Sequence, residues 1–282
     1  MKYLNLGCGQ RFHPEWVNVD FASSNKNVIA HNLLNGIPFN PNEFDVVYHS
    51  HTLEHFSKED GKKFMSECYR VLKPTGIIRV AVPDLEQIVK NYLKYMEGAL
   101  QGNLESFYNY EWIMLEMYDQ TVRTQSGGEM AKYFYQDEIK NEQFVYSRVG
   151  EVGKNIRQRY LDSKNKKVRE YIFKPEPLLK RIVNPSTYIR KVKNIFFKNE
   201  FAEIEKNKKY NDIGRFRLGG EIHQWMYDRY SLLKLLTDMG FFEVTVKTAF
   251  DSNIPKWNSY ELESKGGIIY KPDSLFMEAF KK

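Results

Sequence analysis

Short apolar runs separated by polar turns open the chain, and this pattern predicts the strands of a buried sheet. A helix is expected after Ser57, a capping residue, because apolar residues recur at helical spacing up to Leu72 before Pro74 and Gly76 end it. The predicted strands are Tyr3–Leu6, Asn18–Asp20, Val28–His31, Phe44–Tyr48 and Ile77–Val82. Strands that follow one another with helical crossovers are typical of a parallel sheet.

The pattern changes after the fifth strand. From Leu85 to about Gly220 the chain is predicted to be mostly helical and is rich in Tyr, Lys and Glu. A last helix is expected from its cap Asp228 to Met239, followed by strands at Phe241–Lys247 and Gly267–Tyr270. The long helical region is therefore an insertion before a final helix–strand–strand unit.

A glycine turn follows the first predicted strand. Gly7 and Gly9 flank Cys8 there, and glycines let a backbone come close to a ligand. Asp20 ends the second strand, where a carboxylate can hold a ribose through its hydroxyls. These features favour a cofactor that contains a nucleoside. The dinucleotide fingerprint fits poorly, because no third glycine stands near Phe12 and Asp20 lies too close to the turn.

Five segments in this order extend the pattern: LNLGCG, NVD, FDVVYHSHTLEHF, ECYRVLKPTGIIRVAVPDLE and HQWMYDRYSLLKLLTDMGFFEV. Together they resemble class I S-adenosylmethionine-dependent methyltransferases, most closely the predicted bacterial group associated with surface-polysaccharide synthesis. The resemblance covers residues 1–95 and 221–282. It implies a Rossmann-like α/β fold, with a mainly parallel seven-stranded sheet flanked by helices, and leaves residues 96–220 as a helical, basic insertion. One departure is the short interval between Gly9 and Val17, which leaves little room for the usual first helix.

The resemblance also implies S-adenosylmethionine as the cofactor and assigns positions to it. The glycine turn would lie against the methionine part, and Asp20 would accept hydrogen bonds from the ribose. The loop after the fourth strand would face the sulfonium and the acceptor. The cofactor-binding residues expected in this way are Gly7, Cys8, Gly9, Asp20, Asn32, Leu33, His49 and Ser50.

Transfer of a methyl group to a hydroxyl needs alignment and a base for the departing proton. The candidates are His51, His55, Asp84 and His223. His51 and Asp84 follow the fourth and fifth strands, so both are expected at the carboxyl edge of the sheet, although hydrogen-bonded loop structure would also explain them. His55 is equally explained by ordering of its loop, and His223 by packing at the base of the insertion.

A metal site is not expected. His51 and His55 are four residues apart, a spacing that can supply two ligands from one helix face. However, the helix is predicted to begin only at Ser57, and no third ligand stands nearby in the sequence.

Charge is unevenly distributed along the chain. Residues 154–209 hold 17 Lys and Arg against 6 Asp and Glu, so this segment carries +11 of a chain whose net charge is +6, and the remainder carries −5. Within it, residues 178–200 read as amphipathic, basic helix. A packed helix with a solvated basic face and a surface that rests on anionic lipid both fit this pattern. Nucleic acid is not an expected partner, since no known module for it is present.

The composition completes the functional hypothesis. No apolar run approaches the ~20 residues that span a bilayer, no signal peptide is expected, and the two cysteines suggest no disulfide framework, so the expected location is the cytoplasm, with possible peripheral membrane contact. The expected function is O-methylation of a sugar hydroxyl on a surface glycan or its lipid-linked precursor. The alternatives are an RNA or small-metabolite methyltransferase and a non-catalytic cofactor-binding protein. The sequence names neither the acceptor nor the oligomeric state.

Overall fold

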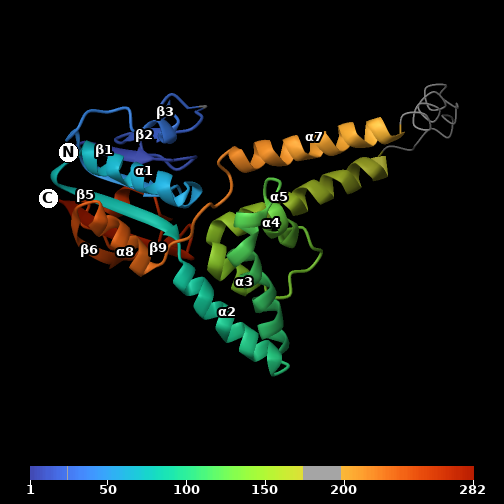
Figure 1. The fold of residues 1–282 in the computed structure, drawn as a ribbon. Helices are drawn as coiled ribbons and strands as arrows, with labels where there is room; N and C mark the ends of the chain where they lie inside the picture. Colours follow the sequence, from blue (N-terminus) through green and yellow to red (C-terminus); the bar gives the residue numbers. More distant parts are fainter. Residues whose placement is uncertain (24, 174–197) are drawn as a thin grey trace.

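The computed structural model describes residues 1–23, 25–173 and 198–282, and its centre is a seven-stranded sheet (Figure 1). The strand order is β3-β2-β1-β4-β5-β9-β6. Strands β1 to β5 pair in parallel, and β9 runs antiparallel to both β5 and β6. The prediction of a Rossmann-like fold with a mainly parallel seven-stranded sheet is therefore confirmed. The strands are β1 Tyr3–Leu6, β2 Val17–Asp20, β3 Val28–Ala30, β4 Phe44–Ser50, β5 Leu72–Pro83, β6 Phe241–Lys247 and β9 Ser274–Lys281.

Helices α1 (Lys58–Val71) and α8 (Arg229–Asp238) supply side chains to the main core of the sheet. Each begins at the cap that the sequence predicts. The Ser57 hydroxyl accepts from the Asp60 N–H, and Asp228 forms a reciprocal capping box with Ser231. The buried apolar residues of the two helices share one core cluster with residues of β1, β4 and β5.

The connection between β1 and β2 contains no helix, as the short interval in the sequence indicates. Residues 7–16, all of them described, form turns before Val17 pairs with Leu4. The carboxyl end of β1 is therefore followed directly by the glycine turn. The site next to it is shaped by the turn and by later segments rather than by a first helix.

The last strand was assigned wrongly from the sequence. Gly267–Tyr270 does not enter the sheet: Ile268–Ile269 (β8) pairs only with Ser264–Lys265 (β7) in a small ribbon. The strand that completes the sheet is β9, which carries Glu278 in its middle. A charged residue in a central strand breaks the apolar pattern from which strands are predicted.

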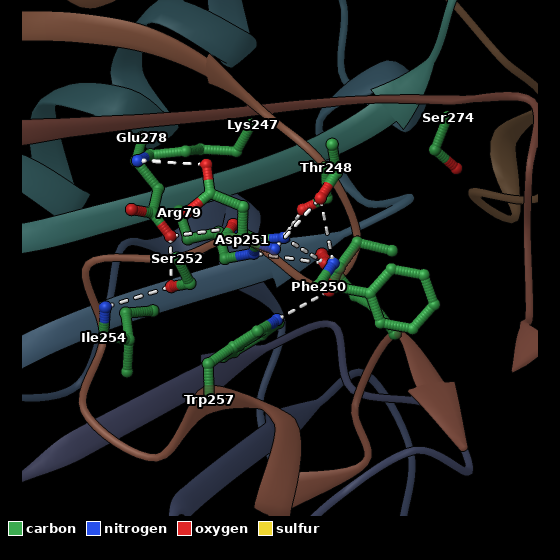
Figure 2. A network of polar contacts seen from close by, with 12 residues as sticks. Arg79, Lys247, Thr248, Phe250, Asp251, Ser252, Ile254, Trp257, Ser274 and Glu278 are labelled. Carbon is green, nitrogen blue, oxygen red and sulfur yellow. Dashed lines mark hydrogen bonds and ion pairs between the residues drawn. The ribbon is translucent and has the colours of Figure 1, made fainter. Parts of the chain in front are cut away.

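Glu278 is accommodated because β5 places Arg79 against it. Figure 2 shows the network around this fully buried guanidinium. Arg79 donates to Glu278 Oε1 at 2.7 Å and to the Thr248 and Asp251 carbonyls at 2.7 and 3.0 Å. It also pairs with Glu263 and lies 4.4 Å from the centre of the Trp257 ring. These contacts fix the segment after β6 across the second face of the sheet.

The inserted helices form a layer beside the sheet with a core of their own (Figure 1). Ile88, Trp112 and Phe134 are among its buried residues, and a buried ion pair of 2.8 Å between Arg148 and Glu116 joins two of its helices. The chain bends at Gly150, whose φ of 59° interrupts the helix around it. The helices are α2 Leu85–Leu100, α3 Leu104–Val122, α4 Gly128–Phe134, α5 Glu142–Phe173 and α7 Lys198–Leu218.

The structure leaves the basic segment 178–200 untested. Residues 178–197 lie outside the described residues, and the side chains of 198–200 are not described either. The packed-helix and lipid-contact interpretations therefore both stay predictions. Within the described parts of the chain, none of the helices combines the length and apolar character needed to cross a bilayer.

Candidate functional site

A cavity of about 300 Å³ lies where β1 and β4 end, beside the glycine turn. Its position at the carboxyl edge of the parallel strands is where ligands bind in sheets of this kind. The cavity is lined by Asn5, Gly7, Cys8, Gly9, Gln10, Arg11, Tyr48, Ser50, His51, Leu262 and Lys271. We refer to it as the turn cavity.

Both glycines of the turn have a positive φ, but they serve different purposes. At Gly7, with φ 64°, an added Cβ would lie 2.2 Å from Thr52 Oγ1, so the protein's own packing excludes any side chain. At Gly9, with φ 54°, an added Cβ would meet only open space. The Gly9 N–H donates to Asp20 Oδ2 at 2.7 Å, which ties the turn to the end of β2. The turn thus presents bare backbone to the cavity.

Cys8 lies between these glycines as a buried thiol. Burial, together with the nearby Asp20 carboxylate, raises the pKa of Cys8 to about 12. The thiolate is the nucleophilic form of cysteine, so Cys8 contributes a neutral wall and no nucleophile at physiological pH.

The other expected cofactor residues are placed in different surroundings. Ser50 lines the turn cavity, whereas Asp20 reaches it through its bond to Gly9. Asn32 caps the short 3-10 helix η1 (Leu33–Asn35), and Leu33 packs against the main core. His49 is fully buried, with its ring 5.0 Å from that of Phe64. Asn32, Leu33 and His49 do not line this cavity.

A second cavity, of about 330 Å³, lies between the edge of the sheet and the inserted helices. Polar groups from the sheet side face it, among them His51, His55 and His223. The insertion contributes apolar side chains and further polar ones: Gln120, Arg123, Met130, Ala131, Phe134, Val149, Val152 and Ile156. We refer to it as the insertion cavity.

His51 is common to both cavities. Its φ of 51° is unusual for a residue other than glycine. Nδ1 lies 3.2 Å from Glu54 Oε1, and Nε2 lies 2.8 Å from Ser274 Oγ. Burial, together with nearby Lys271, lowers the pKa of His51, so the imidazole is neutral at pH 7 and can accept a proton.

His55 and His223 face each other across the floor of the insertion cavity, with ring centres 4.9 Å apart. His55 Nδ1 lies 3.1 Å from the Ile222 carbonyl, and His223 Nε2 lies 4.0 Å from Glu54 Oε1. Burial lowers the pKa of His223 to about 3, although Glu54 opposes this. The sequence-predicted histidines 51, 55 and 223 are thus brought together around Glu54.

Asp84 is placed differently from the other candidate bases. Its carboxylate accepts from the backbone N–H groups of Glu86 and Gln87 and caps α2. It lines neither the turn cavity nor the insertion cavity. Its expected position at the end of β5 is correct, and its observed contacts are those of a helix cap.

Lys271 lines both cavities and was missed in the sequence. Loss of hydration lowers its pKa to about 8, although Glu54 and Asp273 oppose the shift. No motif or periodicity marks this lysine, because the small ribbon of β7 and β8 folds it back over the site. Arg11, stacked 4.0 Å from the centre of the Tyr270 ring, adds a second cation to the turn cavity.

Comparison with known proteins agrees with this architecture. A family model described as a methyltransferase domain matches residues 14–80. No protein of curated function matches the chain in sequence. The matched segment covers β2 to β4, α1 and most of β5, which is less than half of the chain, and the cofactor that such a domain implies is S-adenosylmethionine.

Similar solved structures are remote. A SAM-dependent methyltransferase from Archaeoglobus fulgidus is 13% identical with a TM-score of 0.38, covering 99% of this chain and 86% of its own. A Thermotoga maritima protein described as a SAM-dependent methyltransferase, possible histamine N-methyltransferase, is 11% identical with a TM-score of 0.38, covering 100% and 82%. One chain of a Haloferax volcanii complex, described as between the Trm112 methyltransferase activator and the putative methyltransferase, is 17% identical with a TM-score of 0.26. The match covers 31% of this chain and 47% of that chain. At these scores the likenesses carry no argument about this chain.

Proposed function

We propose that this chain transfers a methyl group from S-adenosylmethionine to a hydroxyl, most simply one on a sugar. The observation that carries the proposal is the junction of two cavities at His51. One cavity has the bare glycine turn of a nucleoside-binding site, and the other is enclosed by the inserted helices. A donor and an acceptor bound in these two places would meet at a neutral imidazole.

The residues of the turn cavity fit the cofactor. Gly9 offers open space at its Cα, and Asp20 holds a carboxylate beside it that can accept from ribose hydroxyls. Arg11 and Lys271 supply positive charge for the carboxylate of an amino acid moiety. Bound S-adenosylmethionine provides a sulfonium methyl, so transfer is a displacement in which the carbon–sulfur bond breaks and an oxygen–carbon bond forms.

In this proposal His51 takes the proton of the acceptor hydroxyl on Nε2, which in the free protein contacts Ser274. Glu54, beside Nδ1, favours the tautomer with its proton on that nitrogen and stabilises the imidazolium that forms. His55 and His223 form the acceptor wall. Asp84 stays a candidate base from the sequence but acts as a helix cap in the geometry described above.

The sugar assignment is supported by the lining of the insertion cavity and by the family resemblance. Gln120, Arg123 and His223 offer hydrogen bonds, whereas Met130 and Phe134 offer apolar surface, and a sugar ring presents both hydroxyls and C–H faces. A lipid-linked glycan precursor would also give the basic segment 178–200 a purpose at an anionic membrane surface, from the cytoplasmic side. No observation favours RNA, and a non-catalytic cofactor-binding protein would leave His51 without a role.

The cofactor assignment is tested by calorimetry with the Asp20→Ala variant. Affinity for S-adenosylmethionine is expected to fall by about 1.5–3 kcal/mol, the usual worth of a hydrogen bond to a charged group. Asp238→Ala, on the exposed end of α8, is the matched control and should bind like the unchanged protein. Equal affinity in the unchanged protein and both variants would contradict the assignment of the cofactor to the turn cavity.

The acceptor is tested by transfer of a labelled methyl group to extracted surface glycans, to lipid-linked sugars and to RNA in parallel. Label in a sugar fraction, at an oxygen identified by mass spectrometry, is the expected result. Label confined to RNA would replace the sugar proposal with an RNA one. Tight cofactor binding without transfer to any fraction would support the non-catalytic alternative.

A further inference from the structure

His55 and His223 line the insertion cavity, and the buried Glu54 lies next to them, although His223 comes from a distant part of the chain. One potential ligand atom from each lies within 4.8 Å of the others. The two segments are fastened by backbone bonds: the N–H groups of Gln224 and Trp225 donate to the Glu54 carbonyl at 2.7 and 3.2 Å. Gln224 Nε2 also donates to the His55 carbonyl at 2.8 Å. The cluster is therefore held by a fixed frame.

The Glu54 carboxylate is buried among imidazoles. Its side chain is 1% exposed, and its ion-pair partners among the described residues are His51 Nδ1 at 3.2 Å and His223 Nε2 at 4.0 Å, both from Oε1. Buried carboxylates are normally paired, hydrogen-bonded or bound to a metal ion. No Lys or Arg of the described residues lies within ion-pair distance of Glu54, so a bound cation would complete its surroundings.

The rings of His55 and His223 are oriented so that each can act as a metal ligand. His55 donates its Nδ1–H to the Ile222 carbonyl at 3.1 Å, which leaves the lone pair on Nε2 available. A ring N–H held by a backbone carbonyl is the usual support of a metal-bound histidine. His223 directs Nε2 toward Glu54, and both rings line the insertion cavity, which gives a path of access.

We propose that Glu54, His55 and His223 bind one divalent transition-metal ion of the Zn²⁺ type. Two imidazoles and a carboxylate form a ligand set of catalytic zinc sites, in which a fourth position stays open. Here that position faces the insertion cavity. Imidazole ligands favour Zn²⁺ over Mg²⁺ and Ca²⁺, which prefer oxygen.

His51 is a positioning residue for this site, because its Nδ1 contacts the carboxylate that would bind the ion. If the proposed function also holds, an acceptor hydroxyl at the open position would be acidified by the metal before His51 takes its proton. This last step rests on the proposed function, whereas the metal site itself does not.

The test is titration of the full-length protein with Zn²⁺ alone, after treatment with a chelator and without S-adenosylmethionine. One equivalent should bind per chain. Glu54→Gln and His223→Gln should each weaken binding at least about 100-fold, since loss of even a supporting partner of a ligand costs about 10–100-fold. His31→Gln is the matched control, because His31 bonds the Gly36 carbonyl away from the site, and its affinity should not change.

A thermal scan with and without Zn²⁺ provides a second readout, since an ion that binds only the folded state raises the melting temperature. The rise should vanish in Glu54→Gln and His223→Gln and persist in His31→Gln. If Glu54→Gln fails to fold, His223→Gln and His55→Gln decide the question. Absence of stoichiometric uptake, uptake unchanged in the ligand variants, or preference for Mg²⁺ would each overturn the site. Because no cofactor is present, such a result would leave the methyltransferase proposal to its own calorimetric test.

Discussion

Glu278 and Glu54 are both fully buried glutamates, and their surroundings differ completely. Glu278 accepts from Arg79 Nη1 at 2.7 Å, from the Ser252 hydroxyl and from the Asn253 N–H at 2.8 Å (Figure 2). Glu54 has only histidines within ion-pair distance among the described residues, His51 Nδ1 at 3.2 Å and His223 Nε2 at 4.0 Å from Oε1. The Glu278 carboxylate is hydrogen-bonded within the fold, whereas the Glu54 carboxylate lies next to the histidines that line the insertion cavity.

The difference separates a structural charge from a functional one. A buried charge is costly unless partners replace its hydration, so Arg79 and Glu278 stabilise the fold only as a unit. The hydrogen bonds between residues 54–55 and 222–225 hold Glu54 among its histidines. The proposed metal ion would supply the cationic partner that Arg79 supplies to Glu278.

The largest expected effect is on the free energy of unfolding, when Glu278 and Glu54 are each replaced by glutamine. Glu278→Gln should lower the free energy of unfolding by about 3 kcal/mol, the lower end for a broken buried pair, because Glu263 still faces Arg79. Glu54→Gln should change it by less, about 1 kcal/mol, because glutamine keeps an oxygen that can accept from His51 Nδ1. Urea unfolding in the presence of a chelator measures both. Equal losses of unfolding free energy in the two variants would show that Glu54 is as important to the fold as Glu278.

A smaller effect is expected on turnover from His51→Asn. Asparagine tolerates the positive φ at this position better than alanine does, so the backbone is preserved while the base is removed. Turnover should fall at least about 100-fold, the lower end for a general base, with little change in S-adenosylmethionine affinity. Initial rates and calorimetry measure the two quantities. A fully active variant would exclude His51 from proton transfer and leave Glu54 without its catalytic partner.

The smallest expected effect concerns pH. Burial, only partly offset by Glu54, lowers the pKa of His49 to about 4 in the folded protein, from an unfolded value of about 6.5. Below pH 6.5 the unfolded chain therefore binds a proton that the folded chain refuses, and stability falls as the pH drops toward 4.

At pH 5 this single residue should account for about 2 kcal/mol of lost stability. His49→Leu should flatten the decline between pH 6.5 and 5, as measured by urea unfolding at a series of pH values. His31→Leu, at a residue near the surface, is the control. An identical decline in all three proteins would show that His49 is not held as a neutral group.

Much of the fold follows from local signals. The caps Ser57 and Asp228 begin their helices as the sequence predicts, and the first four strands lie within two residues of their predicted bounds, whereas β5 begins at Leu72, five residues before the predicted Ile77. The exception is β9, because Glu278 hides its apolar pattern and only Arg79, from another strand, explains that charge. Likewise, the turn cavity was predicted around Gly7 and Gly9, whereas Lys271 carries no local signal.

The sequence by itself determined the order of the first five strands, the two capped helices, the backbone turn at residues 7–9 and the histidines that could act beside it, because each depends on neighbours in the chain. Only the tertiary structure decided which of those histidines share a carboxylate. His223 reaches Glu54 across the whole insertion, and no spacing rule extends that far. The physical reason is that charge, burial and coordination depend on distances in space, which only the folded sheet and its inserted helices fix.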